Sequence, residues 1–304
     1  MTENTPTGDD PVSPAAVAGP VVVIGGGTMG RGIALAAVAA GLDTTLVDSN
    51  RDALGTASRY VEARADKLAA DRGRTAGQLQ VADDLKIAVS DAAVVIEAVV
   101  ERADVKGEVF RTLGRVAPTQ ALLASNTSTL SISELADAAG GSPRVVGMHF
   151  FNPAHRMRLV EVVVGRATSD ATRVDAIGLC RVLDKEPIVV ADVAGFVTSR
   201  LGLLLGNEAI RIIAEGTATA ADVDTAMRLG YNHPMGPLEL ADLVGLDARL
   251  NNLRSVTDRM GRHEFAPPPL LVDLVEAGHL GRKTGRGFYA YDTDGNIVNG
   301  PRHG

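Results

Sequence analysis

The sequence predicts a doubly wound α/β domain followed by an all-α domain. Three observations carry this prediction: a glycine-rich turn between a strand and a helix near the start, an alternation of β-like and helical segments up to about residue 190, and only helical signals after residue 195. A chain of 304 residues also exceeds what one hydrophobic core usually serves, so we expect two domains.

Composition indicates a globular protein, with 45% apolar and 22% charged residues. The net charge of -7 argues against nucleic acid or an anionic membrane surface as the main partner. Cys180 is the only cysteine, which excludes an intramolecular disulfide and a cysteine metal cluster. No apolar run reaches the roughly 18 residues of a membrane span, and residues 1–19 lack Lys and Arg. We therefore expect a cytoplasmic protein with a disordered tail over residues 1–19.

The strongest local pattern lies at the start of the first domain. The apolar strand Val21–Ile24 runs into Gly25-Gly-Gly-Thr-Met-Gly30, which matches G-x-G-x-x-G, and a helix over residues 28–40 follows. Such glycines permit a tight turn and a close approach of backbone N–H groups to a diphosphate. A second strand, Thr44–Val47, ends in Asp48, whose carboxylate can accept hydrogen bonds from both ribose hydroxyls. The residues expected at the dinucleotide in this motif are Gly25, Gly27, Thr28, Met29, Gly30 and Asp48.

Asp48 also bears on the choice of dinucleotide. A 2′-phosphate beside this carboxylate would meet a like charge, and only Arg51 is close in sequence to compensate. The sequence therefore predicts a Rossmann-type domain that binds NAD rather than NADP.

The alternation of strands and helices then continues through the first domain. We expect helices near 51–72, 103–116, 131–139 and 170–183, and strands near 86–89, 93–99, 121–125, 145–151, 159–164 and 186–190. Strands separated by helices favour parallel pairing, with ligands beyond the strand carboxyl ends. Ser125-Asn-Thr-Ser128 follows one such end and either faces the ligand or caps the next helix. Glu101 and Lys106 follow another strand, and from the sequence pattern alone we interpret each as a solvated helix charge.

The stretch from residue 145 to 164 holds the candidate acid-base pair. One apolar strand carries His149, and the next carries Glu161. On neighbouring strands the carboxylate could orient the imidazole, which is the arrangement of a general base and its partner. The alternative is a core histidine and a charge at a strand edge.

From Phe196 onward the pattern is helical, with helices expected near 197–215, 219–228, 237–260 and 270–277. The domains expected are a Rossmann-type domain over 20–194, a helical domain over 195–291 and a tail over 292–304. Nearly continuous apolar runs at 201–205 and 238–246 suggest faces buried against another subunit.

Six motifs in order carry a resemblance to a known family. They are Gly25 to Gly30, Ser125-Asn-Thr-Ser128, Gly147-Met-His-Phe-Phe-Asn-Pro153 through Glu161, Gly195-Phe-Val-Thr-Ser-Arg200, His233-Pro-Met-Gly-Pro-Leu238 and Gly281-Arg-Lys-Thr-Gly-Arg-Gly-Phe-Tyr289. The chain resembles the 3-hydroxyacyl-CoA dehydrogenases, in particular the single-function, 3-hydroxybutyryl-CoA type.

This resemblance implies a helical domain that dimerises, an active site between the two domains, and a role for each matching residue. His149 matches the catalytic histidine, Glu161 its acidic partner and Ser128 a serine that binds substrate. Further dinucleotide contacts match Glu101, Lys106, Asn152 and Lys283, and Arg64 and Lys67 are candidates for acyl-CoA contacts.

The reaction that the resemblance implies is the reversible, NAD-dependent oxidation of a short-chain (S)-3-hydroxyacyl-CoA, as in fatty acid β-oxidation. No metal is expected, because the histidines lack the spacing of metal ligands. Two alternatives stay open: the same chemistry on a group attached to a carrier protein, and a dinucleotide-binding protein without turnover.

The chain departs from the family pattern in two places. Ala194-Gly-Phe196 and Ser199 stand where the family commonly has Pro-Gly-Phe and an asparagine, so we expect the Ser199 hydroxyl to serve as the donor to a substrate oxygen. His155-Arg156 stands where apolar residues or proline are usual, which puts a rival histidine near His149.

Overall fold

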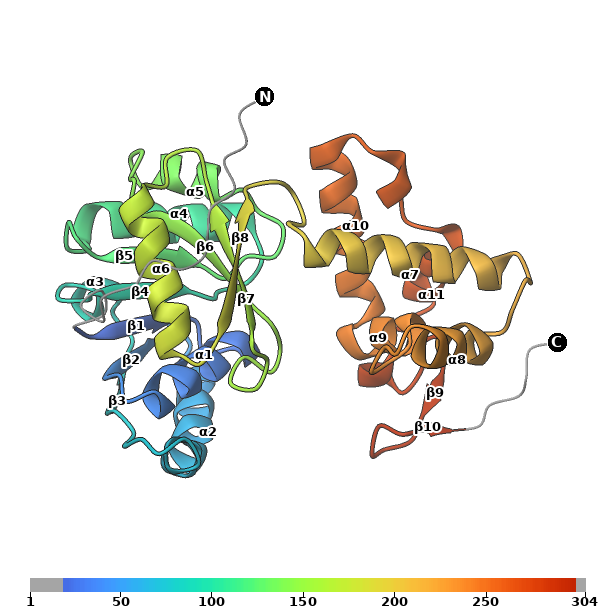
Figure 1. Cartoon of the computed structure of the whole chain (residues 1–304), viewed down its shortest axis with the longest axis horizontal. Helices are drawn as coiled ribbons and strands as arrows, with labels where there is room; N and C mark the ends of the chain where they lie inside the picture. Colours follow the sequence, from blue (N-terminus) through green and yellow to red (C-terminus); the bar gives the residue numbers. More distant parts are fainter. Residues whose placement is uncertain (1–18, 299–304) are drawn as a thin grey trace. The chain divides into compact units, whose positions relative to one another are not determined.

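The computed structural model describes residues 19–298, and the chain divides into two compact units between Val193 and Ala194 (Figure 1). The first unit is built on a sheet, and the second is mostly helical. The tail expected over residues 1–19 lies outside the described residues, except for Gly19.

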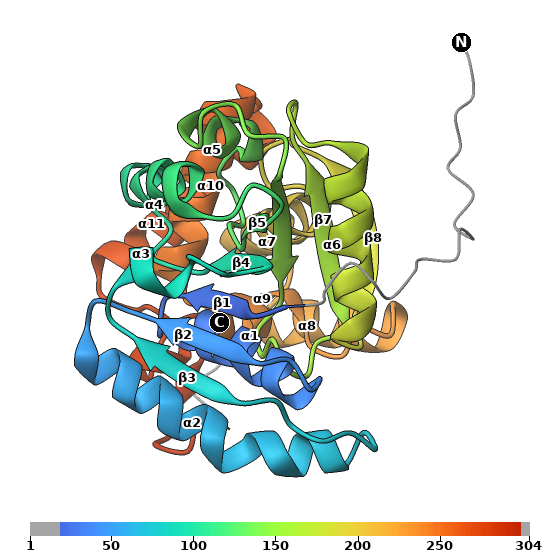
Figure 2. The ribbon, with the colours of Figure 1, turned by 90° about the vertical axis from the view of Figure 1, so that its left-hand side faces the viewer.

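The first unit contains an eight-stranded sheet in the order β3-β2-β1-β4-β5-β6-β7-β8 (Figure 2). Every neighbouring pair is parallel except β6 and β7, which are antiparallel. The eight residues between β6 and β7 are too few for a crossover helix, so the chain reverses there. The strands are β1 (Val21–Ile24), β2 (Thr44–Val47), β3 (Leu79–Ala82), β4 (Val94–Glu97), β5 (Leu122–Ser125), β6 (Val145–Phe150), β7 (Leu159–Val164) and β8 (Glu186–Ala191). The predicted α/β class is confirmed.

Helices connect these strands and cover the sheet. They are α1 (Thr28–Ala39), α2 (Arg51–Ala70), α3 (Leu85–Ala88), α4 (Ala103–Val116), α5 (Ile132–Ala138) and α6 (Asp170–Val182). Helix α1 is rich in alanine and almost wholly buried, which lets it pack closely on the strands. Helix α2 buries Leu54, Ala57, Val61, Ala65 and Ala69, spaced three or four residues apart, and leaves its other face exposed.

One predicted element of this unit is wrong. The segment near 86–89 is not a strand: it contains the short helix α3, and the edge strand β3 precedes it. Asp84 caps this helix, because its Oδ1 accepts hydrogen bonds from the backbone N–H of Lys86 (2.8 Å) and Ile87 (3.3 Å). Strand β3 escaped prediction because it lies at the sheet edge and half of its residues are exposed.

The second unit contains five α-helices among its described residues. They are α7 (Thr198–Ala214), α8 (Ala220–Gly230), α9 (Pro237–Val244), α10 (Leu246–Met260) and α11 (Pro269–Glu276), with short 3-10 turns η2 (His263–Phe265) and η3 (Arg282–Thr284). The single helix predicted over 237–260 is wrong. Gly245, with φ of 103°, separates α9 from α10, because this backbone conformation cannot continue a right-handed helix.

The second unit also ends in a small hairpin of β9 (Ala290–Tyr291) and β10 (Ile297–Val298). The predicted helical domain is confirmed, with this two-stranded hairpin as an addition that the sequence pattern missed, and part of the predicted tail over 292–304 belongs to the hairpin. Residues 299–304 lie outside the described part.

None of the helices between residues 19 and 298 is long and apolar enough to cross a membrane.

Two buried aspartates connect the hairpin region to α9. Asp224 accepts hydrogen bonds from the N–H of Leu238 at the start of α9 (2.9 Å) and from the Tyr289 hydroxyl (2.8 Å). Asp242 accepts from the Tyr289 N–H (2.9 Å) and the Tyr291 hydroxyl (3.0 Å). Burial raises the pKa of Asp242. Two of the family motifs, those that end in Leu238 and Tyr289, thus have a structural role in this unit.

Asp192 holds the start of α5 in a similar way. Its carboxylate accepts hydrogen bonds from the Ser131 hydroxyl (2.7 Å) and from the N–H groups of Ile132 (3.0 Å) and Ser133 (2.8 Å). Burial alone would raise the pKa of Asp192, but the hydrogen bonds from Ser133, Ser131 and Ile132 outweigh it and hold the pKa below the ordinary value of 3.8. The ionised form therefore stabilises the fold.

We predict that Asp192→Ala lowers the free energy of unfolding by about 1–2 kcal/mol near neutral pH. Because the folded pKa is depressed, this contribution is present above pH 3.8 and is lost as the pH falls through the folded pKa. Urea unfolding of the full chain at several pH values measures it. Asp137→Ala, which removes the exposed ion pair with Arg166, is the matched control on α5 and should cost little. An equal effect of the two changes would contradict the prediction.

Candidate active site

The antiparallel register of β6 and β7 pairs His149 with Glu161. The Nδ1 atom of His149 lies 2.7 Å from Oε2 of Glu161. Glu161 is fully buried and His149 is 9% exposed, so this polar contact is shielded from water. The His149 ring also packs against the Phe151 ring, with the ring centroids 4.7 Å apart. The two side chains expected to meet do so, and their packing restricts the orientation of the imidazole.

The loop after β5 is held by Glu101. Its Oε1 accepts hydrogen bonds from the Thr127 hydroxyl (2.5 Å) and from the N–H groups of Ser128 (2.9 Å) and Thr129 (3.2 Å). Burial alone would raise the pKa of Glu101, but Lys106 and these hydrogen bonds outweigh it and lower the pKa. The ionised Glu101 carboxylate thus fixes the position of the loop that bears Ser128.

Glu97, which sequence reasoning missed, organises the same region. This fully buried carboxylate at the end of β4 accepts hydrogen bonds from Lys106 Nζ (2.6 Å), the Ser125 hydroxyl (2.7 Å) and the Val99 N–H (2.7 Å). Lys106 is 1% exposed and also lies 3.3 Å from Glu101. The interpretation of Lys106 as a solvated helix charge is therefore wrong. The signal that could have revealed Glu97 is an acid that directly continues an apolar strand.

Asn126 joins this network to the strand of His149. Its side-chain oxygen accepts a hydrogen bond from the Phe150 N–H at 2.9 Å. Ser125 also pairs with Gly147 in the register of β5 and β6. The loop bearing Ser128 and the strand bearing His149 are therefore held together by direct contacts within the first unit.

The glycine-rich turn has the shape that a dinucleotide diphosphate requires. A Cβ added at Gly30 would lie 1.8 Å from the Gly25 carbonyl oxygen, whereas one at Gly27 would meet no heavy atom within 4 Å. Gly27 is the N-cap of α1, and no side chain caps this helix end. Open space and a positive helix end thus occur together, which suits a diphosphate beside Thr28 and Met29.

Asp48 lies at the end of β2, beside this turn. Its Oδ2 accepts a hydrogen bond from the Gly26 N–H at 2.6 Å, and its Oδ1 accepts one from the Asn50 N–H at 2.8 Å. These contacts fix the carboxylate next to the glycines, where a carboxylate can bind an adenosine ribose. The turn and Asp48 together fit NAD.

A hollow of about 610 Å³ lies between α1, α2 and the loop after β6. We call it the basic hollow, because Arg31, Arg64, Lys67 and Arg156 line it against a single acid, Asp71. Thr28 and Asn152, both expected at the dinucleotide, also line it.

An aromatic ring lies at the centre of this cationic cluster. The Tyr60 ring lies 4.7 Å from the Arg31 guanidinium and 4.2 Å from that of Arg64. The family resemblance pointed to Arg64 and Lys67, which share α2 with Tyr60, but Arg31 and Arg156 come from other parts of the chain, and only the fold brings them to this helix.

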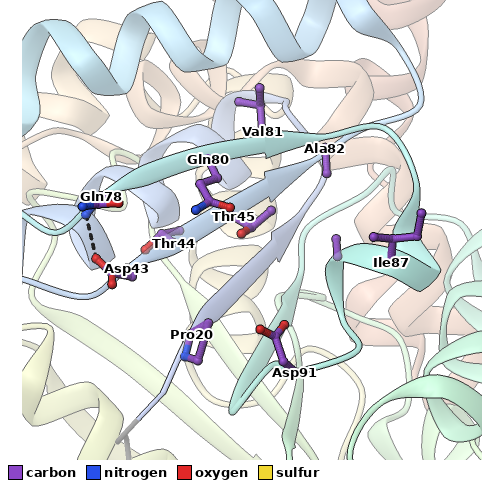
Figure 3. Close-up of a pocket in the computed structure, with 11 residues that line it drawn as sticks. Pro20, Asp43, Thr44, Thr45, Gln78, Gln80, Val81, Ala82, Ile87 and Asp91 are labelled. Carbon is purple, nitrogen blue, oxygen red and sulfur yellow. Dashed lines mark hydrogen bonds between the residues drawn. The ribbon is translucent and has the colours of Figure 1, made fainter.

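A second hollow, of about 280 Å³, lies on the side of β2 and β3 (Figure 3). Asp43 and Asp91 line it together with uncharged residues, and Asp43 accepts a hydrogen bond from the Gln78 N–H at 2.9 Å. No lysine or arginine is among its lining residues, so it lacks the charge needed to bind a phosphate.

The rival histidine, His155, lies in a different environment. Its Nδ1 is buried and has no hydrogen-bond partner among residues 19–298. Burial and the nearby cations Arg156, Lys185 and Arg64 lower its pKa. A general base needs a partner that stabilises its charged form. Of the two histidines, it is His149 that has a carboxylate beside it, that of Glu161.

The two remaining predicted site residues lie in the second unit. Ser199 is in the first turn of α7. Lys283 lies in η3, and its Nζ pairs with both carboxylate oxygens of Asp247, at 2.6 and 2.7 Å.

Comparison with known proteins finds matches over both units. The 3-hydroxyacyl-CoA dehydrogenase NAD-binding domain matches residues 20–193, and the C-terminal domain of the same family matches residues 195–291. The chain belongs to the 3-hydroxyacyl-CoA dehydrogenase family. It is accordingly an NAD-dependent oxidoreductase that acts on CH–OH groups, and the family and cofactor predicted from the sequence are confirmed.

Similar dehydrogenases occur in bacteria and animals. A probable 3-hydroxybutyryl-CoA dehydrogenase of Bacillus subtilis is 40% identical over 90% of this chain and 97% of its own length. The rat mitochondrial hydroxyacyl-coenzyme A dehydrogenase is 38% identical over 89% of this chain and 90% of its own length. Among solved structures, the (S)-3-hydroxybutyryl-CoA dehydrogenase PaaH1 of Ralstonia eutropha has a TM-score of 0.82 at 35% identity, covering 90% of this chain and 99% of that one.

We predict that Lys106→Met destabilises this dehydrogenase by about 3–5 kcal/mol, because it leaves the buried Glu97 carboxylate without its cation. The midpoint of urea unfolding of the full chain measures the effect. Adding Glu97→Gln to the same chain should restore part of the loss, since the unpaired charge is then removed. Lys86→Met, at an exposed lysine, is the control. Wild-type stability of the Lys106→Met protein would refute the prediction.

Proposed function

We propose that this dehydrogenase catalyses the reversible oxidation of short-chain (S)-3-hydroxyacyl-CoA to 3-oxoacyl-CoA, with His149 as the general base. The observation that carries the proposal is the buried contact of 2.7 Å between His149 Nδ1 and Glu161 Oε2. Bacterial relatives that bear the name 3-hydroxybutyryl-CoA dehydrogenase support a short acyl chain.

In the proposed reaction His149 takes the proton of the 3-hydroxyl group. Glu161 holds Nδ1, so proton exchange with the substrate falls to Nε2. The carboxylate also stabilises the imidazolium that forms, in the way the aspartate of a Ser-His-Asp triad does. Bound NAD supplies the hydride acceptor. In the reverse direction the same imidazolium returns its proton to the oxygen.

Donors are also needed at the substrate oxygens. We assign one to Ser128, whose backbone N–H donates to Glu101; its hydroxyl, 3.4 Å from the same Glu101 oxygen, would turn to donate to the substrate instead. We assign a second to Ser199, in the place of the family's asparagine, because a hydroxyl can also donate to a developing negative charge. Lys283, Asn152, Glu101 and Lys106 remain proposed dinucleotide contacts, although Lys106 would act mainly through Glu101 because it is buried.

The basic hollow would hold the nucleotide portion of CoA. Its cations match the phosphates of that nucleotide, and the Tyr60 ring holds two of them, Arg31 and Arg64, in place. A carrier protein presents phosphopantetheine without this nucleotide, so a cluster of cations in a protein of net charge -7 favours CoA.

Exposed apolar side chains on α7 and α9 support the proposal of a homodimer through the helical unit. They are Leu201, Leu205, Leu240, Leu243 and Val244. We also propose a cytoplasmic location, on the expectation from the single cysteine. Consumption of NADH with acetoacetyl-CoA would separate this enzyme from a dinucleotide-binding protein without turnover.

We predict that His149→Ala lowers kcat by about 10²- to 10⁴-fold and leaves the affinity for NADH nearly unchanged. Steady-state kinetics with acetoacetyl-CoA and fluorescence titration of NADH measure the two quantities. His155→Ala is the matched control and should retain most of kcat. A larger loss of kcat from His155→Ala than from His149→Ala would show that the base has been misassigned.

We predict that Arg64→Ala and Lys67→Ala each raise KM for acetoacetyl-CoA by about tenfold, because each removes a charged contact to a phosphate. The KM for acetoacetyl-N-acetylcysteamine, which lacks the nucleotide, should not change. Arg59→Ala, on the same helix but outside the lining of the basic hollow, is the control. Equal effects on both substrates would place the CoA nucleotide elsewhere.

A further inference from the structure

Arg51 begins α2, three residues after Asp48, and it is engaged with a carboxylate. Its Nη2 and Nε atoms donate to the same oxygen, Oδ2 of Asp83, at 2.7 and 3.1 Å. Asp83 lies directly after β3, the neighbour of the strand that ends beside Asp48. Three charged groups therefore follow one another at this corner of the sheet. They are the Asp48 carboxylate, expected at the ribose, then the Arg51 guanidinium, and then the Asp83 carboxylate that binds Arg51.

This arrangement bears on the 2′-position of the adenosine ribose. In dinucleotide folds an acid at the end of the second strand binds the 2′-hydroxyl of NAD, whereas a nearby arginine accommodates the 2′-phosphate of NADP. Arg51 is close enough in the chain to take that second role, because it starts the helix that follows Asp48. Asp83 competes with a 2′-phosphate for the same guanidinium.

We propose that Asp83 is a second determinant of NAD selectivity, which holds Arg51 away from a 2′-phosphate. The proposal goes beyond the proposed function, because it concerns which dinucleotide binds and not which thioester reacts. Asp48 alone would disfavour a 2′-phosphate by repulsion, yet a free Arg51 would offset part of that repulsion. The pairing with Asp83 removes this offset.

The size of the effect follows from the exposure of the pair. The side chains of Arg51 and Asp83 are 85% and 49% exposed, so solvent screens their attraction. Releasing Arg51 should therefore change affinity several-fold rather than by orders of magnitude. Low ionic strength is the suitable condition for measuring it, because salt screens exposed charges.

The test is calorimetric binding of two nucleotides to the full chain, adenosine 2′,5′-bisphosphate and 5′-AMP. We expect Asp83→Ala to tighten binding of the bisphosphate by about fivefold and to leave 5′-AMP within about twofold of wild type. The value of kcat/KM with NADPH should rise by a similar factor, and that with NADH should not. The two calorimetric titrations need no thioester substrate, so they stand apart from the test of the proposed function.

Two further variants separate release of Arg51 from simple loss of negative charge. Asp52→Ala removes an equal charge from the residue next to Arg51, and it should leave bisphosphate binding within about twofold of wild type. Asp83→Ala combined with Arg51→Ala should lose the gain. Unchanged bisphosphate affinity in Asp83→Ala, an equal gain in Asp52→Ala, or a gain that survives in the double variant would each overturn the proposal.

Discussion

Two buried carboxylates, on the inner strands β4 and β7, constrain the rest of the site. Glu97 and Glu161 are both fully buried, and a buried charge is tolerated only where partners surround it. Glu97 meets Lys106, Ser125 and the backbone of Val99, whereas Glu161 meets His149. The need to satisfy these two acids brings together four strands and the loops that follow them.

The reversal between β6 and β7 makes the second of these contacts possible. A parallel crossover would separate the two strands by a helix, whereas the antiparallel pair places residue 149 directly opposite residue 161. The short connection then supplies Asn152, His155 and Arg156 to the basic hollow. One local change of strand direction therefore serves both the proposed base and the proposed binding of the CoA nucleotide.

Charge is distributed unevenly over this acidic protein. Cations gather in the basic hollow, whereas the proposed ribose end of the dinucleotide site has Asp48 and the pair of Arg51 with Asp83. The first arrangement suits a ligand rich in phosphate, and the second suits a ribose that carries hydroxyls alone. The charges of the two sites would thus distinguish the phosphate-rich nucleotide of CoA from the adenosine of NAD.

The sequence by itself determined the parts of this protein that depend on local pattern. The glycine turn, Asp48 and the family motifs are contiguous, so the α/β class, the family and NAD followed from residue order. Adjacent apolar strands also foretold that His149 and Glu161 would meet. The short helix capped by Asp84 and the break at Gly245 were missed, because one capping side chain or one positive φ overrides an apolar pattern.

Tertiary structure alone decided the contacts between distant segments. Lys106 is buried because Glu97, nine residues earlier on a strand, accepts its charge, and the spacing does not show this. Tyr60 lies between Arg31 and Arg64 because α1 packs against α2, and Asp83 reaches Arg51 because β3 pairs with β2. Charges have no periodicity that reveals their partners, and only the folded chain brings those partners within a few ångströms.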